Sequence, residues 1–393
     1  MEKINFYNDN ELRFCKSFRD KNELYRARKG TMLRASIENF YYKKYWREKL
    51  ELFDFQNINN LPSKCFVKFQ NKTLALSKWV SPKRTRSYPY ARVYDTFDCG
   101  ANKVVTIIPL IKDEGIKGDR DYLQWDTISL MSLLNVYVIL AFYDEAQLNS
   151  KNKDKITNQH FNHSYIQAQL GTLVSYHQSA LHWNLNQLSP KNLSSLAKLV
   201  KNSYIDIAKS LDCKLHDFKS IDQFIEKILK TKESFMQFSR LKAQQTQNAE
   251  SLTLQPKELL GRGKKSKIVI ENYLGGQYFF TIDEVIFKNN TLYLCESKHS
   301  KNALLPSNDD IKDGLLKLML YNNLSQIQNV EHFKIILRLT SNSLKDNFTL
   351  PSDNLDCFIA KHSFSNSQIK MLQSLNEESK QNGFELWINN ALL

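Results

Sequence analysis

The sequence contains no C-x-x-C pair, no apolar stretch of membrane-spanning length and no apolar segment near its first residue. Its six cysteines are scattered, so we expect reduced thiols and no cysteine-based zinc cluster. The longest apolar run, residues 128–143, is interrupted by polar side chains and is shorter than the ~20 residues of a membrane-spanning helix, which predicts a buried core segment. The opening residues also lack the apolar region of a secretory signal, so the sequence predicts a cytoplasmic protein without membrane association.

Acidic residues are outnumbered by basic ones, 41 to 55, which gives a net charge of +14. This excess of positive charge favours a polyanionic partner, either nucleic acid or an anionic membrane. The hydrophobic content of 42% indicates packed cores rather than a disordered chain. A length of 393 residues is sufficient for two domains, or for three small ones.

Residues 276–300 are the most informative stretch, because they read as two strands joined by a tight turn. Aromatic and β-branched side chains fill both arms, which is typical of strands. Asn289 and Asn290 suit a two-residue loop, since asparagine tolerates the positive φ angles that such a loop requires. The turn fixes the register, so each residue of the first arm has a defined partner in the second.

This register places Asp283 opposite Glu296, with Cβ atoms roughly 4.5–5.5 Å apart. Lys298 shares their face because side chains alternate along a strand, whereas Glu284 faces Cys295 on the other side. Hard cations such as Mg²⁺ prefer carboxylate oxygens, and a nearby lysine can orient or deprotonate a water molecule. The alternative is a surface pair in which Lys298 merely neutralises two exposed acids, although opposed acids repel each other without a cation.

An Asp on one strand and Glu-x-Lys on the next resembles the PD-(D/E)xK nuclease superfamily, and most closely type II restriction endonucleases. Ile282 stands where the name of the motif has proline. The resemblance covers roughly residues 251–393 and implies Mg²⁺-dependent hydrolysis of phosphodiester bonds in double-stranded DNA. It implies that Asp283 and Glu296 hold the metal and that Lys298 orients the attacking water. Other [DE]-x-Lys matches in the chain lie in polar or helical contexts without an opposed acid.

The neighbouring segments fit the same superfamily. Helices are predicted at residues 257–274 and 309–324, and strands at residues 332–340 and 356–362. Glu271, on the first of these helices, is a candidate accessory acid. We therefore expect an α/β (α+β) fold with a carboxy-terminal restriction-endonuclease-like core, in which helices flank a central mixed sheet.

The chain is predicted to divide into an amino-terminal DNA-binding or recognition region, residues 1–250, and a nuclease domain, residues 251–393. The polar residues 241–256 are the expected linker. The first region is expected to be mixed α/β and rich in helices, with residues 147–250 mostly helical. Residues 1–55 predict one or two basic helices, which either follow a phosphate backbone or form a solvated face.

Two basic segments are candidates for DNA contact. The first, punctuated by serine and proline, predicts a loop that leads into a strand, and the second is the glycine-flanked start of the helix at residues 257–274. Arginine binds phosphates and can reach guanine edges with two hydrogen bonds. The candidates are Lys83, Arg84, Arg86, Arg92, Arg262, Lys264 and Lys265.

The acidic residues between 113 and 126 follow an apolar strand and precede a helix and a second strand. Their spacing is not that of a calcium-binding loop. We expect a charged connecting loop in which Arg120 pairs with Asp119 or Asp121. The alternative is that its carboxylates accept hydrogen bonds from cytosine.

The resemblance also implies partners. Cleavage of both DNA strands usually needs two active centres, so a homodimer is expected. A restriction endonuclease implies a companion DNA methyltransferase that acts on the same site. The alternatives are a non-specific defence or repair nuclease, and a catalytically inert DNA-binding protein.

Overall fold

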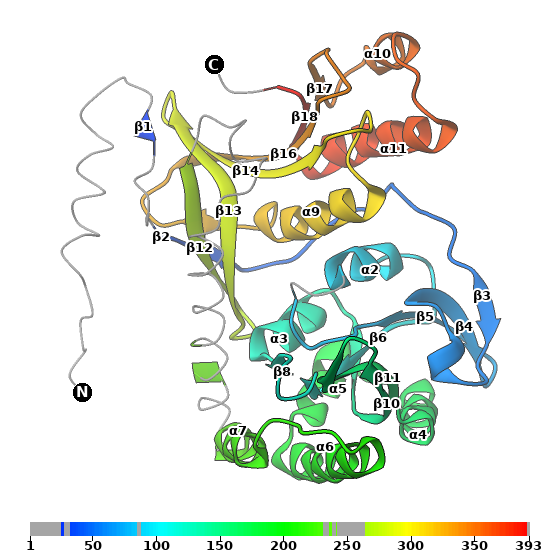
Figure 1. Cartoon of the computed structure of the whole chain (residues 1–393). Helices are drawn as coiled ribbons and strands as arrows, with labels where there is room; N and C mark the ends of the chain where they lie inside the picture. Colours follow the sequence, from blue (N-terminus) through cyan, green and yellow to red (C-terminus); the bar gives the residue numbers. More distant parts are fainter. Residues whose placement is uncertain are drawn as a thin grey trace, which may run out of the picture.

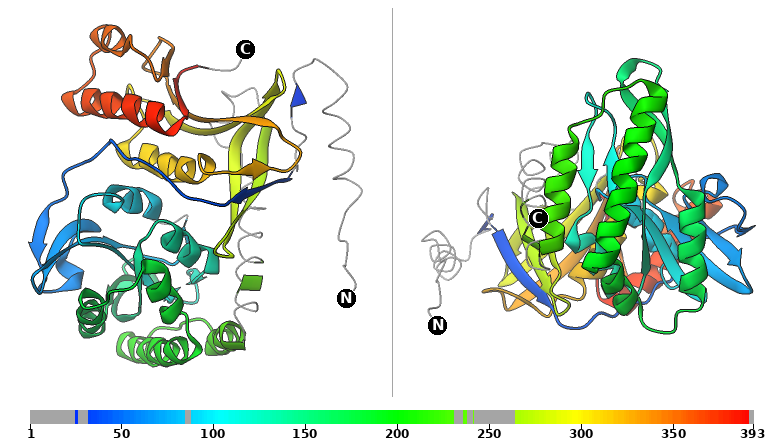
Figure 2. Two further views of the ribbon diagram at one scale, coloured as in Figure 1. Left: turned by 180° about the vertical axis from the view of Figure 1, so that it is seen from behind. Right: turned by 90° about the horizontal axis from the view of Figure 1, so that it is seen from below.

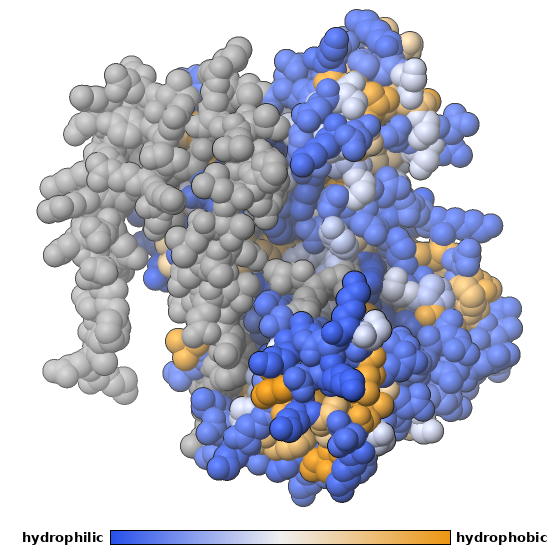
Figure 3. All heavy atoms as spheres, viewed as in Figure 1, coloured by the Kyte–Doolittle hydropathy of each residue, from blue (hydrophilic) through white to orange (hydrophobic). Residues whose placement is uncertain are grey.

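The computed structural model describes most of the chain, namely residues 25–26, 32–84, 88–230, 236–237, 241 and 264–390. The described part is a mixed α/β structure in which helices flank a central mixed sheet (Figure 1). This agrees with the predicted α/β class. No helix within these residues has the length and apolar character needed to cross a membrane. On the face drawn in Figure 3 hydrophilic residues predominate, with smaller hydrophobic patches toward the lower part.

The central sheet has nine strands, ordered β15-β2-β12-β13-β14-β16-β18-β17, with β1 paired to β13. Strands β12, β13 and β14 are antiparallel neighbours, whereas β2 with β12, β14 with β16, and β16 with β18 are parallel. Their bounds are β1 Tyr25–Arg26, β2 Met32–Ile37, β12 Lys264–Asn272, β13 Gln277–Lys288, β14 Thr291–Ser300, β15 Gln326–Ile327, β16 His332–Ser341, β17 Phe348–Leu350 and β18 Glu385–Ile388.

A second sheet of five strands, ordered β3-β4-β5-β6-β9, is built from the amino-terminal half. Its strands are β3 Leu52–Asp54, β4 Lys64–Phe69, β5 Lys72–Lys78, β6 Lys103–Pro109 and β9 Tyr137–Ala141. Two hairpins accompany it, formed by β7 Ile111–Asp113 with β8 Arg120–Tyr122 and by β10 Tyr143–Asn149 with β11 Asn152–Phe161. The strand, helix and strand predicted around residues 103–143 are confirmed, whereas the predicted acidic loop between them contains the β7–β8 hairpin.

Helices cover both sheets. They are α2 Pro89–Thr96, α3 Trp125–Leu133, α4 His163–Val174, α5 Ala180–Gln187, α6 Pro190–Leu211, α7 Phe218–Lys230, α9 Asn308–Tyr321, α10 Leu355–Ala360 and α11 Asn366–Asn382, with a short 3₁₀ helix, η1 Ile58–Asn60. Helices α4 and α5 pack on β9, and α5 and α6 pack on each other, at the side of the molecule that faces the viewer in the right panel of Figure 2. Helix α9 packs on β14 and β16 with one side and on α2 with another (Figure 1).

The sequence explains where α9 lies. The Ser307 side chain accepts a hydrogen bond from the backbone N–H of Asp310 and so caps the helix, and acidic residues occupy the first turn, where they are favourable. Residues at helical spacing, including Ile311, Leu315 and Leu318, are buried in the core. The predicted helix at residues 309–324 is therefore confirmed, as is the strand predicted at residues 332–340, which is β16.

The five-stranded sheet with its helices (residues 52–230, the amino-terminal lobe) and the nine-stranded sheet with α9, α10 and α11 (the carboxy-terminal lobe) share one hydrophobic core. Strand β2 precedes the predicted boundary near residue 250, yet it pairs with β12 inside the carboxy-terminal sheet. Buried polar groups also connect the lobes. Lys312 of α9 lies 2.7 Å from Asp95 of α2, and both side chains are 1% exposed.

The fully buried Glu378 of α11 makes a second connection between the lobes. It accepts hydrogen bonds from the hydroxyl groups of Tyr42, at 2.7 Å, and Tyr94, at 2.6 Å. It also accepts from the backbone N–H groups of Tyr45 and Trp46, at 2.8 and 2.9 Å. A buried carboxylate is stable only with such partners, so α11, α2 and the segment after β2 hold one another in place.

Several predicted elements are wrong. Residues 264–272, predicted as part of a helix, form β12, because Ile268 and Ile270 enter the core while Val269 faces the other side. Most of the strand predicted at residues 356–362 belongs to α10, since a short apolar run fits either element. Within residues 1–55 the described part contains strands rather than helices, and residues 143–161 form a hairpin before the predicted helices begin. The predicted linker, residues 241–256, lies outside the described residues except for position 241.

Candidate active site

The hairpin of β13 and β14 has the predicted turn. Asn289 and Asn290 have φ angles of 49° and 59°, as a two-residue hairpin loop of this kind requires. Lys288 pairs with Thr291, and the ladder continues to Glu284 paired with Cys295. The predicted register is therefore confirmed as far as Glu284 and Cys295, and the regular ladder does not extend to Asp283 and Glu296.

Beyond the last of these pairs, the same register brings Asp283 next to the segment of Glu296 and Ser297. The carboxylate of Asp283 accepts a hydrogen bond from the backbone N–H of Ser297 at 3.0 Å. Asp283 therefore contacts β14 through its side chain, at the point where the backbone pairing of β13 with β14 ends. It is partly buried, whereas the Glu296 side chain is fully buried.

A β-bulge lies at Asp283 and Glu284. On the β12 side, Ser266 pairs with Ile282 and Lys264 pairs with Val285, so β13 contains one extra residue between these pairs. Ile282 and Val285 consequently both enter the main core although they are three positions apart. Bulges redirect side chains and are frequent next to active sites.

Glu284 points to the opposite face of the sheet from Glu296, as predicted. It is 3% exposed and forms an ion pair with Arg338 of β16, with 2.5 Å between Oε2 and a guanidinium nitrogen. Cys295 and Trp387 pack on this same face. Glu284 is therefore a structural acid, and Asp283 is the acid on the side of Glu296.

Glu296 and Lys298 lie on the face of β14 that α9 covers. The Lys298 ammonium is 3.2 Å from Oε1 of Glu296. Two residues of α9 that the sequence reasoning missed complete the cluster. Asp313 lies 2.9 Å from the Lys298 ammonium, and the Lys317 ammonium lies 2.8 Å from Oε1 of Glu296. Asp313 and Lys317 are four positions apart and so share one face of the helix.

Gly314 explains how α9 comes so close to the sheet. A Cβ atom at this position would lie 2.9 Å from Cδ1 of Leu337 and 3.2 Å from Cε of Lys298. A Cβ atom at this position would therefore force the side chains of Leu337 and Lys298, or the helix, to shift. A glycine in the middle of a helix is destabilising by roughly 0.5–1 kcal/mol relative to alanine. A glycine inside the predicted helix was therefore the feature of the sequence that could have indicated this close contact.

The electrostatics of the cluster keep both lysines charged. Burial by itself lowers the pKa of Lys298, but the carboxylates of Asp313, Glu296 and Asp283 outweigh it and raise the pKa well above its ordinary value. The same balance, with Glu296 as the largest charge contribution, raises the pKa of Lys317. A lysine that holds its proton this firmly is suited to orienting water or offsetting negative charge, and poorly suited to removing a proton.

The donor chemistry fits a hard divalent cation. Three carboxylates and two ammonium groups leave one negative charge in excess within the cluster, and Asp283 and Glu296 offer oxygen ligands from adjacent strands. Among the described residues no three Asp, Glu, His or Cys side chains converge to hold a metal by themselves. Water or phosphate oxygens would therefore complete the coordination, as is common for Mg²⁺.

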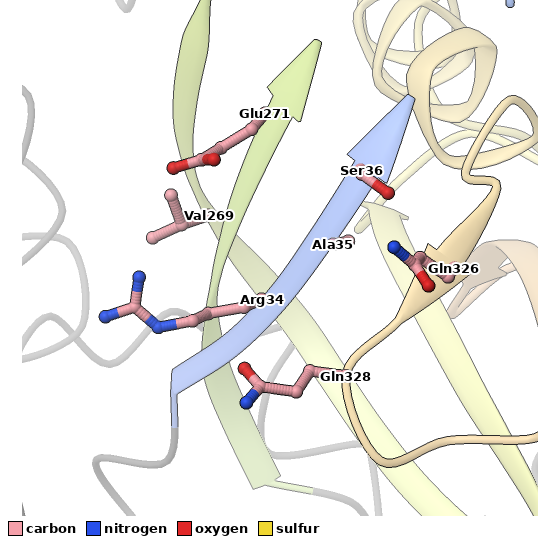
Figure 4. A pocket seen from close by; sticks show the side chains of 7 residues that line it. All are labelled: Arg34, Ala35, Ser36, Val269, Glu271, Gln326 and Gln328. Atoms are coloured by element: carbon pink, nitrogen blue, oxygen red, sulfur yellow. The ribbon is translucent and has the colours of Figure 1, made fainter. Parts of the chain in front are cut away.

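Glu271 does not belong to this cluster. It lies on β12 rather than on a helix, pairs with Gln277 and hydrogen-bonds to its side chain. Gln277 precedes Asp283 by six strand residues, or roughly 20 Å. Glu271 instead borders a hollow of about 280 Å³ on the opposite face of the sheet (Figure 4), which is lined by Arg34, Ala35, Ser36, Val269, Glu271, Gln326 and Gln328.

Arg84, one of the predicted DNA contacts, is turned into the protein. Its guanidinium forms a 2.9 Å ion pair with the buried Asp126, donates to the Phe279 carbonyl at 3.1 Å and stacks over the Phe280 ring at 4.9 Å. The side chain is 11% exposed. These contacts join α3 to β13 and give Arg84 a structural role that the sequence did not reveal.

The other basic candidates have different surroundings. Arg92 lies in α2, so the basic loop leads into a helix and the predicted strand is wrong. The Arg92 guanidinium donates a hydrogen bond to the Lys78 carbonyl at 2.6 Å. Lys83 and Lys265 are partly exposed. Lys264 begins β12, with only its backbone described. Arg86 and Arg262 lie outside the described residues, and DNA contact by any of these side chains stays a prediction.

Tyr88 places the start of α2 beside the cluster. It is 53% exposed and its backbone is left-handed, with φ 46°. The carboxylate of Asp310 is the largest influence that raises the pKa of Tyr88, and burial and Asp313 add to it. The basic segment predicted for DNA contact therefore ends next to the acids of α9.

The acidic segment of residues 113–126 is structural in the described protein. Asp113 is fully buried and forms a 2.5 Å ion pair with Arg120 and a 2.7 Å contact with His216. The predicted pairing of Arg120 with Asp119 or Asp121 is wrong, because the β7–β8 hairpin places Arg120 opposite Asp113.

Comparisons of the chain with protein-family models, with curated proteins and with solved structures gave no match. The chemistry of the cluster is therefore the basis for inferring a function. The informative features are the register of the hairpin, the burial of Glu296 and the position of α9.

Proposed function

We propose that the protein is an Mg²⁺-dependent nuclease with a PD-(D/E)xK active site, which cleaves double-stranded DNA in the manner of a type II restriction endonuclease. The observation that carries this proposal is the hairpin register, which places Asp283 beside Glu296 with Lys298 on the same face. A surface pair does not account for this arrangement, because the Glu296 side chain is fully buried and Lys298 is 11% exposed.

Each residue of the cluster has a role in this proposal. Asp283 and Glu296 would hold the metal, which when bound polarises the phosphate and lowers the pKa of a water molecule. Lys298 orients the attacking water and offsets negative charge on the phosphate. Asp313 holds Lys298 through the 2.9 Å ion pair and so acts as a positioning residue.

The topology of the carboxy-terminal lobe supports a restriction-endonuclease-like core. An antiparallel hairpin, β13–β14, is followed by α9 and then by β16, which returns parallel to β14. Strand β18 extends the parallel set after α11. Helix α9 covers the face that carries the cluster, so hairpin, helix and strand follow in the order that the resemblance implies, whereas residues 264–272 before the hairpin form β12 instead of the expected helix.

DNA is the proposed partner. The net charge of +14 favours a polyanion, and the basic segment before α2 ends at Tyr88, beside the acids of α9. The amino-terminal lobe would supply recognition, and a homodimer would supply two active centres for two strands. A cytoplasmic location and a companion DNA methyltransferase belong to the same proposal.

Digestion of phage DNA tests the proposal. Purified protein with Mg²⁺ is expected to give discrete fragments, and a chelator is expected to stop the reaction reversibly. A smear would instead indicate a non-specific nuclease. Unchanged DNA that is nevertheless retarded in a gel would indicate an inert DNA-binding protein. The control is Lys334→Ala, which removes an exposed lysine from the opposite face of the sheet and should cut normally.

A further inference from the structure

Two ammonium groups contact a single oxygen of one buried carboxylate. Oε1 of Glu296 lies 2.8 Å from the ammonium of Lys317 and 3.2 Å from that of Lys298. Lys298 is also held by Asp313 at 2.9 Å. Lys317 therefore makes the shorter contact with an oxygen that the proposed metal ion would need.

Physical chemistry explains why a cation is present there. A fully buried carboxylate is costly to ionise without a compensating positive charge. In the metal-free protein Lys317 supplies that charge from α9. Its side chain is 20% exposed, so Lys317 is not sealed in the core as Glu296 is. Lysine also carries a compact charge on a flexible four-carbon stem, which can move without displacing the helix.

We propose that Lys317 is a stand-in for the metal ion: its ammonium occupies Glu296 in the metal-free protein and competes with a divalent cation for that carboxylate. This inference rests on the metal site of the proposed function. When Mg²⁺ binds, the Lys317 ammonium leaves Oε1 of Glu296. Lys317 thereby compensates the charge of Glu296 until the metal binds and sets the metal affinity, without itself contacting the scissile phosphate.

The test is calorimetric titration of the full-length protein with Mg²⁺ alone, so that no turnover contributes. Lys317→Met is expected to bind Mg²⁺ at least tenfold more tightly than the wild type, a difference of about 1.4 kcal/mol. Lys317→Arg keeps the charge and should stay near the wild-type affinity. Lys334→Met removes a lysine paired with Glu385 far from the cluster and should leave the affinity unchanged.

A second measurement covers the case in which Lys317→Met is too unstable for calorimetry. The rise in Tm caused by Mg²⁺ should be larger in Lys317→Met than in the wild type, because the metal then supplies the charge that the variant lacks. Equal rises in Tm would overturn the inference, as would equal or weaker Mg²⁺ binding by Lys317→Met.

Asp283→Asn distinguishes failure of this inference from failure of the metal site. If Mg²⁺ binding by the wild type is lost in Asp283→Asn but is no tighter in Lys317→Met, the site stands and the competition does not occur. If the wild type binds Mg²⁺ with the same affinity as Asp283→Asn, the metal site of the proposed function fails as well. A structure with Mg²⁺ bound in which the Lys317 ammonium remains 2.8 Å from Glu296 would also refute the competition.

Discussion

Asp283 and Glu284 are adjacent acids with different partners, the Ser297 backbone N–H for Asp283 and the buried Arg338 for Glu284, so their substitution should have different consequences. Glu284 faces the buried Arg338, and both side chains are less than 5% exposed. Removing one partner of a buried ion pair typically costs about 3–5 kcal/mol. Because glutamine keeps the shape and one hydrogen bond, we expect Glu284→Gln to lower the free energy of unfolding by about 3 kcal/mol.

For cleavage the expected order of the two variants is reversed, with the larger loss in Asp283→Asn. Glu284→Gln, measured where it remains folded, should cleave within about tenfold of the wild type, a barrier change of at most about 1.4 kcal/mol. Asp283→Asn removes a proposed metal ligand and should cost about 4 kcal/mol of barrier, or roughly a thousandfold in rate. It should lower the unfolding free energy by only about 1 kcal/mol, because asparagine can still accept the partly buried hydrogen bond from the Ser297 N–H, which is weakened.

The assay pairs urea unfolding, followed by circular dichroism, with cleavage of a plasmid in Mg²⁺ by the same preparations. Each variant serves as the control for the other. Severe and equal losses of cleavage in two folded variants would show that both acids reach the active site. That result would refute the register and the bulge as the basis for assigning Asp283.

Four further expectations follow from the described contacts. Lys298→Ala should abolish detectable cleavage while DNA affinity in gel-retardation assays stays within about threefold, because the proposed DNA contacts lie on other surfaces; cutting that survives would place the active site elsewhere. Asp313→Asn should lower kcat about 10–100-fold with KM little changed, since Lys298 loses its positioning partner, and an unchanged kcat would show that Lys298 needs no such partner. Burial lowers the pKa of Lys44 to about 8, so between about pH 8 and 10.4 the unfolded chain binds more protons than the folded protein. The free energy of unfolding of the wild type relative to that of Lys44→Met, measured in urea titrations, should therefore rise across that window. A difference that stays flat would contradict this expectation. A fragment of residues 1–246 lacks β12, the partner of β2, and should show broad, weakly cooperative unfolding by circular dichroism, whereas a sharp transition would show that the amino-terminal lobe folds alone.

The hairpin could be predicted from sequence because its geometry is local. Two asparagines at positive φ fix the turn, and the turn fixes which residues lie opposite each other up to Glu284 and Cys295. The bulge could not be predicted, since it depends on β12, and residues 264–272 were expected to be helical. A short apolar run that is β-branched at its centre fits both a buried strand and a helix, and only pairing with β13 decides between them.

The residues that α9 contributes to the cluster could not be predicted from the sequence, for a different reason. Its existence followed from helical spacing, but the face it presents to the sheet depends on the packing of Gly314 against Leu337 and Lys298. Asp313 and Lys317 therefore became visible as parts of the cluster only in three dimensions. Arg84 is the opposite case, a residue that the sequence suggested for DNA contact and that the structure buries. Its contacts with Asp126 and Phe280, which are distant in sequence, could not be predicted from its polar neighbours.

The position of β2 has a consequence for the synthesis of the protein. Residues 38–263 separate β2 from β12, its parallel partner, so the ribosome must make this whole stretch before the pairing can form. At ~5–20 residues per second, β2 waits roughly 10–45 s for β12. During that interval the amino-terminal lobe can begin to fold, while β13, β14 and α9 do not yet exist. A nascent chain therefore carries none of the proposed active-site residues while its amino-terminal lobe takes shape.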